Sequence, residues 1–147
     1  MTHSSPTYLV DGRPLTADQC RALFAAIPLQ DRQIKVLERI EGDTIIDIGC
    51  FSGAFVREAS TRFPGKTVIG VDYSEDNIRI ARLLYPDLGE RFRRMSAYGL
   101  DMPSESADCI TLHGAPGRGR SRGQGGKPRP KARWRAHHQC AEPVLYP

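Results

Sequence analysis

One pattern constrains this chain more than any other: an apolar segment is followed by a glycine-containing turn and then by a helical segment. Residues 44–48 are almost continuously apolar, which is typical of a strand buried on both faces of a parallel sheet. After the turn at residues 49–53, Phe55, Ala59 and Phe63 recur every four positions, as they do on one face of a helix. The pattern therefore predicts a buried strand that leads directly into a helix.

The same alternation continues along the chain. Four segments have the character of short buried strands: residues 44–48, 67–71, 91–95 and 108–112. Helical periodicity marks four others: residues 16–27, 30–40, 54–63 and a segment that the Ser74 hydroxyl can cap at its start. Strands that alternate with helices of about ten residues indicate βαβ units. The predicted fold is therefore α/β, with a Rossmann-like parallel sheet.

The character of the sequence changes at residue 114. Residues 1–113 carry 13 Lys and Arg against 16 Asp and Glu, whereas residues 114–147 carry 8 Lys and Arg against a single Glu. The net charge of +4 therefore comes from the second part, in which no strand or helix period continues. We expect an N-terminal extension with a helix (1–29), a half-domain whose sheet is truncated after about four strands (30–113), and a disordered basic tail (114–147).

The turn after the first strand is a candidate nucleotide site. Glycine permits a tight turn and a close approach of ligand to backbone, and the helix that follows presents N–H groups at its start. Asp72 lies 25 residues after Asp47, at the predicted end of the second strand. A carboxylate at this position can accept hydrogen bonds from both hydroxyls of a ribose. This arrangement is also compatible with a dinucleotide, which leaves a nucleotide-dependent oxidoreductase as an alternative.

Three ordered blocks resemble a known family. The sequence DIGCFSG at residues 47–53 resembles motif I of class I S-adenosylmethionine-dependent methyltransferases, whose usual form is DIGCGxG. Residues 68–74, VIGVDYS, resemble the second motif, GxDxS, and residues 95–108 resemble the third block, GDAxxLP followed by FD. Three blocks in the right order and spacing are more specific than one glycine motif. The resemblance covers about residues 33–112, the N-terminal half of such an enzyme.

The resemblance implies S-adenosyl-L-methionine as cofactor and methyl transfer to an unknown acceptor. It implies a role for each of nine positions in cofactor binding: the methionine end at Asp47, Gly49, Cys50 and Gly53, the ribose at Asp72, the adenine at Tyr73, Ser96 and Ala97, and the border of the methyl-transfer site at His113. Methyl transfer needs no elaborate acid–base set, because the sulfonium is already an activated methyl donor and positioning can supply much of the acceleration. We therefore assign no catalytic residue, and we assign no metal ligand.

Two residues depart from the family pattern. Phe51 stands where a second glycine is common, so its side chain must point away from the ligand or crowd it. Ser96 stands where an aspartate commonly accepts a hydrogen bond from the adenine amino group, and a hydroxyl accepts without the assistance of a charge. A structural role remains the alternative for Asp47 and a surface position for Asp72. Cys50 has no basic partner nearby in sequence, which does not favour a nucleophile.

The tail admits two interpretations. The Arg–Gly segment at residues 117–123 and Trp134 suit an RNA-binding arm on a nucleotide-fold binding protein. We favour a frameshift, because an adjacent reading of the codons permits the string REVNRVLKPGG, which resembles the next helix and turn of a methyltransferase. A frameshifted chain is expected to be an incomplete or inactive enzyme, with nucleic acid as a partner only if the tail is genuine.

The remaining expectations concern the compartment. The chain has no run of about 18 apolar residues and no signal-like N-terminus, so we expect no membrane partner and a cytoplasmic location. The four cysteines form no CxxC pair, and reduced thiols are the default in that compartment.

Overall fold

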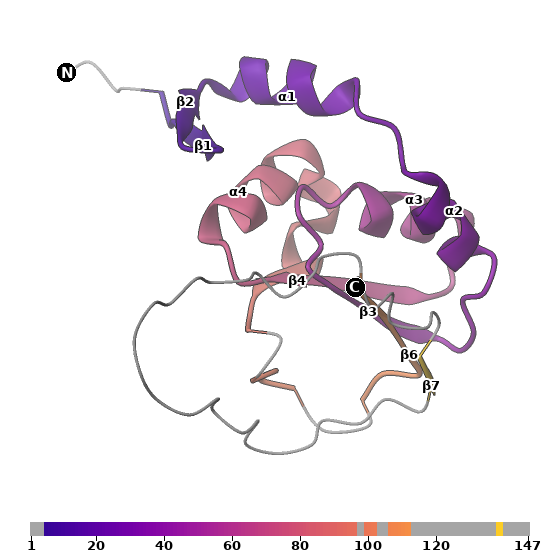
Figure 1. Cartoon of the computed structure of the whole chain (residues 1–147). Helices are drawn as coiled ribbons and strands as arrows, with labels where there is room; N and C mark the ends of the chain where they lie inside the picture. The colour runs from indigo at the N-terminus through magenta and orange to yellow at the C-terminus, as the bar shows by residue number, and fades with distance from the viewer. Residues whose placement is uncertain (1–4, 97–98, 103–105, 113–137, 140–147) are drawn as a thin grey trace, which may run out of the picture.

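The computed structural model describes residues 5–96, 99–102, 106–112 and 138–139. Its centre is a sheet in the order β5-β4-β3-β6-β7, in which every neighbouring pair is parallel (Figure 1). The strands are β3 (Thr44–Ile48), β4 (Thr67–Asp72), β5 (Phe92–Arg94), β6 (Cys109–Leu112) and β7 (His138–Gln139). The α/β parallel fold and its four expected strands are confirmed. The two-residue β7 adds a strand in a segment for which none was predicted.

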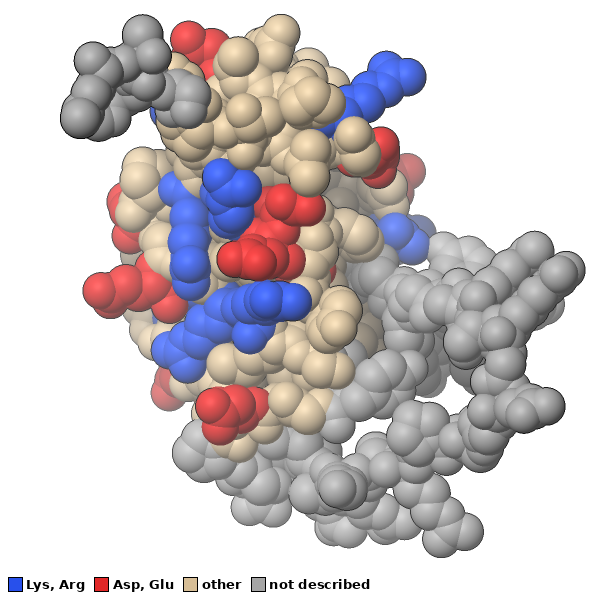
Figure 2. All heavy atoms as spheres, turned by 90° about the vertical axis from the view of Figure 1, so that its left-hand side faces the viewer, with Lys and Arg blue, Asp and Glu red and all other residues tan. Residues whose placement is uncertain are grey.

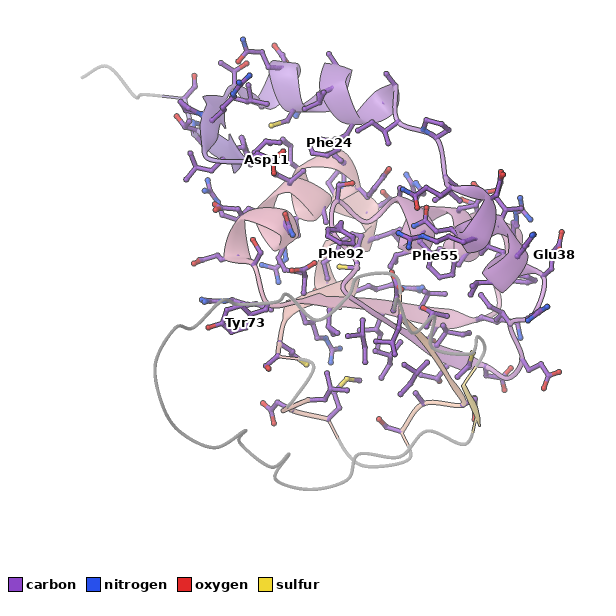
Figure 3. All side chains as sticks on the ribbon, in the orientation of Figure 1. Asp11, Phe24, Glu38, Phe55, Tyr73 and Phe92 are labelled. Carbon is purple, nitrogen blue, oxygen red and sulfur yellow. The ribbon has the colours of Figure 1, made fainter. Side chains whose placement is uncertain are left out.

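Three helices cover one face of this sheet (Figure 1). They are α2 (Asp31–Leu37), α3 (Ala54–Arg62) and α4 (Glu75–Leu84). The main core lies between these helices and the sheet, and it includes Ile45, Phe55 and Phe92, the last two of which are labelled in Figure 3. Side chains alternate between the faces of a strand, so Asp47 shares the helix-covered face with Ile45. The site residues of β3 therefore lie on the helix side.

A smaller apolar cluster covers the opposite face of the sheet. Its members come from β3, β4 and the segment after β5, and they are Ile46, Ile48, Ile69, Val71, Met95, Leu100, Met102 and Ala107. Ile46 and Val71 are fully buried in it. The continuous apolar character of β3 and β4 is explained by this second cluster, because both faces of these strands are covered.

The N-terminal region contains a hairpin that the sequence analysis did not predict. Strands β1 (Tyr8–Val10) and β2 (Arg13–Leu15) pair antiparallel around Asp11 and Gly12, which both have positive φ. An Asp-Gly pair is a strong signal for a two-residue hairpin turn of this kind, so the sequence contained the information. The Arg79 side chain of α4 donates a hydrogen bond to the Thr7 carbonyl and lies over the Tyr8 ring.

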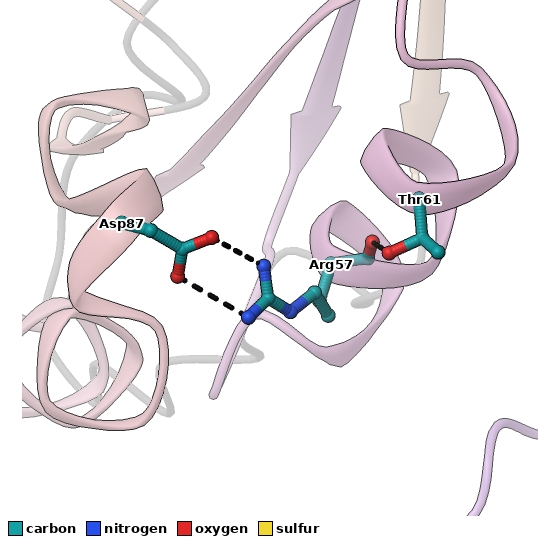
Figure 4. A network of polar contacts seen from close by, with 3 residues as sticks. All are labelled: Arg57, Thr61 and Asp87. Carbon is teal, nitrogen blue, oxygen red and sulfur yellow. Dashed lines mark hydrogen bonds and ion pairs between the residues drawn. The ribbon is translucent and has the colours of Figure 1, made fainter.

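Two further elements complete the described chain. Helix α1 (Ala17–Ala25) begins with a capping box formed by Thr16 and Gln19. In Figure 1 it lies above α4, on the side away from the sheet. A 3₁₀ helix, η1 (Pro86–Arg91), follows α4 and is tied to α3 by a bidentate pair between Arg57 and Asp87 (Figure 4). The hydrogen bonds from Arg57 lower the pKa of Asp87.

The cysteines differ in state. Cys20 and Cys50 carry buried free thiols, whereas Cys109 is disulfide-bonded, so the expectation of reduced thiols is wrong at this position. In the described ranges, no helix has both the length and the apolar character that a membrane span requires.

Gly70 is a position at which the core leaves no room for a side chain. A Cβ atom there would lie 2.9 Å from Val56 Cγ2 and 3.0 Å from both Cβ and Sγ of Cys50. Overpacking of this kind costs about 1–3 kcal/mol. We expect Gly70→Ala to lower the free energy of unfolding by this amount in urea titrations. Gly65→Ala, where a Cβ meets nothing within 4 Å, serves as the control; equal losses in the two variants would contradict the packing argument.

Candidate functional site

Backbone hydrogen bonds connect the turn between β3 and α3 to the end of β4. The amides of Gly49 and Cys50 both donate to the Val71 carbonyl, at 2.8 and 3.1 Å, and the Gly53 amide donates to the Cys50 carbonyl at 2.9 Å. Gly49 and Gly53 have φ values of 74° and 86°, in the left-handed region that favours glycine. Because these three amides already donate hydrogen bonds within the protein, a ligand at the turn would contact its backbone without accepting hydrogen bonds from them.

Asp72 ends β4 and holds the structure around it together. Its Oδ2 accepts the Phe51 amide at 3.0 Å and its Oδ1 accepts the Ser74 amide at 2.9 Å. The carboxylate therefore joins the turn to the start of α4, where the Ser74 hydroxyl caps the helix by accepting the Asn77 amide. Each carboxylate oxygen can accept about two hydrogen bonds, so capacity for ligand hydroxyls remains. The residue is 9% exposed, which excludes a mere surface acid.

Asp47 is fully buried on the neighbouring strand. Its Oδ1 accepts the Thr111 hydroxyl at 2.7 Å, and Thr111 is its partner in the β3–β6 register. Burial raises the pKa of Asp47 to about 8, the Thr111 hydrogen bond opposes this rise, and the charge of Asp72 adds to it. Sequence analysis did not identify Thr111. The available signal was a hydroxyl in the otherwise apolar strand CITL. The strand register that places it beside Asp47 could not be read from the sequence.

Cys50 belongs to the core. The residue is buried, and burial, followed by the charges of Asp47 and Asp72, raises the pKa of its thiol far above the ordinary range. The thiolate is therefore not available as a nucleophile, in agreement with the sequence argument. Its side chain fills the space left by the missing side chain of Gly70.

Gly53 has a packing role as well as a conformational one. A Cβ atom at this position would lie 2.6 Å from the Phe92 ring and 3.2 Å from the Ala81 Cβ. The turn therefore packs tightly against β5 and α4. The absence of a side chain at Gly53 is explained without a ligand.

The adenine-side candidates are less enclosed. Tyr73 is 72% exposed at the carboxyl end of β4 (Figure 3), and Arg94 lies over its ring and donates to its carbonyl. Ser96 is half-buried and forms a bridge with Gly99. Ala97 and His113 lie outside the described residues. Arg94 also forms an ion pair with Glu75 at 3.6 Å. On the face of the molecule shown in Figure 2, acidic side chains lie between basic ones.

Phe51 has an unusual backbone conformation for an aromatic residue. Its φ is 51°, in the left-handed region, and its side chain is 50% exposed. The side chain reaches solvent, and the turn keeps a conformation that glycine would adopt freely. A left-handed conformation costs a non-glycine residue roughly 1–2 kcal/mol.

Replacing Phe51 by glycine should stabilise the protein. Relief of the left-handed conformation gains roughly 1–2 kcal/mol, and the greater freedom of glycine in the unfolded chain returns about 0.5–1 kcal/mol of it. We therefore expect Phe51→Gly to raise the free energy of unfolding by about 0.5–1 kcal/mol. Phe51→Ala is the matched control, because it removes the ring and keeps the strain. A glycine variant no more stable than the alanine variant would argue against stored strain.

The buried carboxyl of Asp47 should make stability depend on pH. Folding raises its pKa from the ordinary value of 3.8 to about 8, so its contribution to stability is fully present below pH 4 and is lost as the pH rises through about 8. We expect the free energy of unfolding to fall by up to about 1.4 kcal/mol per pH unit in this window. Urea titrations of Asp47→Asn should lack this slope, whereas the exposed Asp18→Asn should retain it. If the free energy of unfolding of Asp47→Asn changes with pH in parallel with that of the wild type, Asp47 is not the source of the pH dependence.

Comparisons with known proteins agree on the nature of the domain. A family model described as a methyltransferase domain matches residues 45–118. The chain is similar to a ubiquinone biosynthesis O-methyltransferase of Hydrogenovibrio crunogenus, with 40% identity over 62 residues, which are 42% of this chain and 25% of that protein. The chain thus spans a quarter of the length of this curated relative.

The chain is also similar to two solved structures that are described as methyltransferases. One is geranyl diphosphate C-methyltransferase from Streptomyces coelicolor A3(2) in complex with S-adenosyl-L-homocysteine, at 18% identity and a TM-score of 0.49, with 55% of this chain and 32% of that chain covered. Another is precorrin-6y C5,15-methyltransferase from Geobacter metallireducens GS-15, at 21% identity and a TM-score of 0.49, with coverages of 63% and 52%. From the match of the family model, the chain belongs to the methyltransferase domain family, and the class I resemblance is confirmed.

Proposed function

We propose that this chain binds S-adenosyl-L-methionine at the carboxyl ends of β3 and β4 and serves methyl transfer. The observation that carries the proposal is the position of Asp72. Its carboxylate ends a buried strand, lies beside the glycine-containing turn and is oriented by two backbone amides. Ligands of open parallel sheets bind at the carboxyl ends of the strands, and a carboxylate there suits a ribose.

The surrounding residues fit this cofactor. Asp72 would accept the ribose hydroxyls, and the exposed ring of Tyr73 would lie beside the adenine. The backbone of Gly49, Cys50 and Gly53 would border the methionine end, whose positive charge suits the buried acid Asp47. Ser96, Ala97 and His113 keep the roles that the resemblance implies.

The chemistry demands little more from these residues. When bound, the cofactor supplies a sulfonium-activated methyl group, and the protein orients it and excludes water. Among the described residues, no group of three or more His, Cys, Asp or Glu is placed to hold a metal ion. The acceptor of this chain stays unassigned. That residues 114–147 are a frameshifted C-terminal half stays a prediction about the coding DNA.

The proposal is tested by calorimetric titration of the full chain with S-adenosylmethionine and S-adenosylhomocysteine. We expect both to bind, and Asp72→Asn to weaken them about 10- to 100-fold, since a hydrogen bond to a charged group contributes roughly 1.5–3 kcal/mol. Asp18→Asn, whose carboxylate is 95% exposed on α1, is the charge-matched control.

The same titration includes NAD to separate the oxidoreductase alternative. A folded chain that binds NAD and neither sulfur ligand would overturn the proposal. Loss of affinity in Asp72→Asn is interpreted only if the variant retains a cooperative melt, because Asp72 also holds the turn.

A further inference from the structure

Thr111 is a buried polar residue that the proposed cofactor site does not yet explain. It lies on β6 between Ile110 and Leu112, and it is fully buried. Burying a hydroxyl costs free energy unless it forms a hydrogen bond, and valine has nearly the same shape without this cost. Thr111 instead donates its hydroxyl hydrogen to Asp47 Oδ1 at 2.7 Å.

The geometry of this hydrogen bond is imposed by the sheet. Asp47 and Thr111 are partners in the parallel β3–β6 register, so their side chains leave the sheet side by side on the helix-covered face. The branched side chain of threonine has few rotamers, which fixes the direction of the hydroxyl. Asp47 lies two residues before Gly49, so the hydrogen bond acts at the base of the turn.

We infer that Thr111 is a positioning residue for the cofactor, whose hydroxyl holds the Asp47 carboxylate at the base of the turn toward the cationic methionine end. This inference rests on the proposed function. It assigns to the centre of β6 a role in affinity that neither the motifs nor the comparisons include.

The groups around Asp47 explain why a hydroxyl donor is needed to favour its carboxylate form. Asp72 faces it from β4, and the Cys50 thiol faces it from the turn. Burial and Asp72 both favour the protonated acid, and they raise its pKa to about 8, whereas the Thr111 hydrogen bond lowers it. A cation bound nearby favours the carboxylate, so binding should release a proton when the pH lies below the pKa.

The test is calorimetric titration of the full chain with S-adenosylmethionine between pH 6.5 and 9.5. The variants are Thr111→Val, Thr111→Ser and Asp47→Asn. The last one reports the titration of the ligand's own amino group, because α-amino groups have pKa values of about 7.7–8.0. Repeating the wild-type titration in buffers of different ionisation enthalpy measures the protons released.

We expect the wild-type affinity, relative to Asp47→Asn, to rise with pH to a plateau above about pH 8. Thr111→Val should move this midpoint to higher pH and weaken binding up to about tenfold at pH 7.5, because each pH unit corresponds to a factor of ten. Thr111→Ser should restore the wild-type midpoint. The wild type should release protons at pH 7, and Asp47→Asn should release fewer.

The outcomes separate the inference from the proposed function. If the wild type binds with no more proton release than Asp47→Asn, or if Thr111→Val lowers affinity equally at every pH, the inference is wrong and the cofactor proposal stands. If a cooperatively folded wild type binds neither S-adenosylmethionine nor S-adenosylhomocysteine, the proposed function fails and the inference fails with it. Should Thr111→Val not fold, the proton count still tests the inference, which fails if the wild type releases no more protons than Asp47→Asn.

Discussion

The end of β4 is the point on which the site depends. The Val71 carbonyl accepts the amides of Gly49 and Cys50, and the next residue, Asp72, accepts the amide of Phe51 through its side chain. Three consecutive amides of the turn are thus bound by two consecutive residues of the neighbouring strand. These hydrogen bonds fix the backbone conformation of the turn. Parallel pairing of β3 with β4 sets the distance at which these hydrogen bonds form.

This dependence has an electrostatic cost. Asp47 and Asp72 lie on neighbouring strands and on the same face of the sheet, and the charge of Asp72 disfavours the charged form of Asp47. Asp72 meets two amides, whereas Asp47 meets a hydroxyl in a fully buried position. The two acids are therefore unequal: Asp72 is oriented by two backbone amides, and Asp47 has a pKa raised to about 8. A ligand with a positive charge at one end and ribose hydroxyls at the other suits this inequality.

The parts of the fold that depend on local patterns were predictable. Strands β3 and β4 are almost continuously apolar because both of their faces are buried, and Asp72 ends β4 at a recognisable spacing from Asp47. Strand register is not a local property, so the contact between Asp47 and Thr111, 64 positions apart, was out of reach. The engagement of the Gly49 and Cys50 amides was missed for the same reason. The β1–β2 hairpin is different, because its Asp11-Gly12 signal was present and was overlooked.

Phe51 shows how such non-local constraints act on a single residue. Its amide is fixed by Asp72, and the preceding amides are fixed by Val71, so the backbone at position 51 takes a left-handed conformation whatever its side chain. Glycine and phenylalanine therefore reach the same turn at different energetic cost. Because the ring is half exposed, burial regains only part of that cost. The strain at position 51 is therefore imposed by the hydrogen bonds of the neighbouring strand, and packing of the ring offsets only part of it.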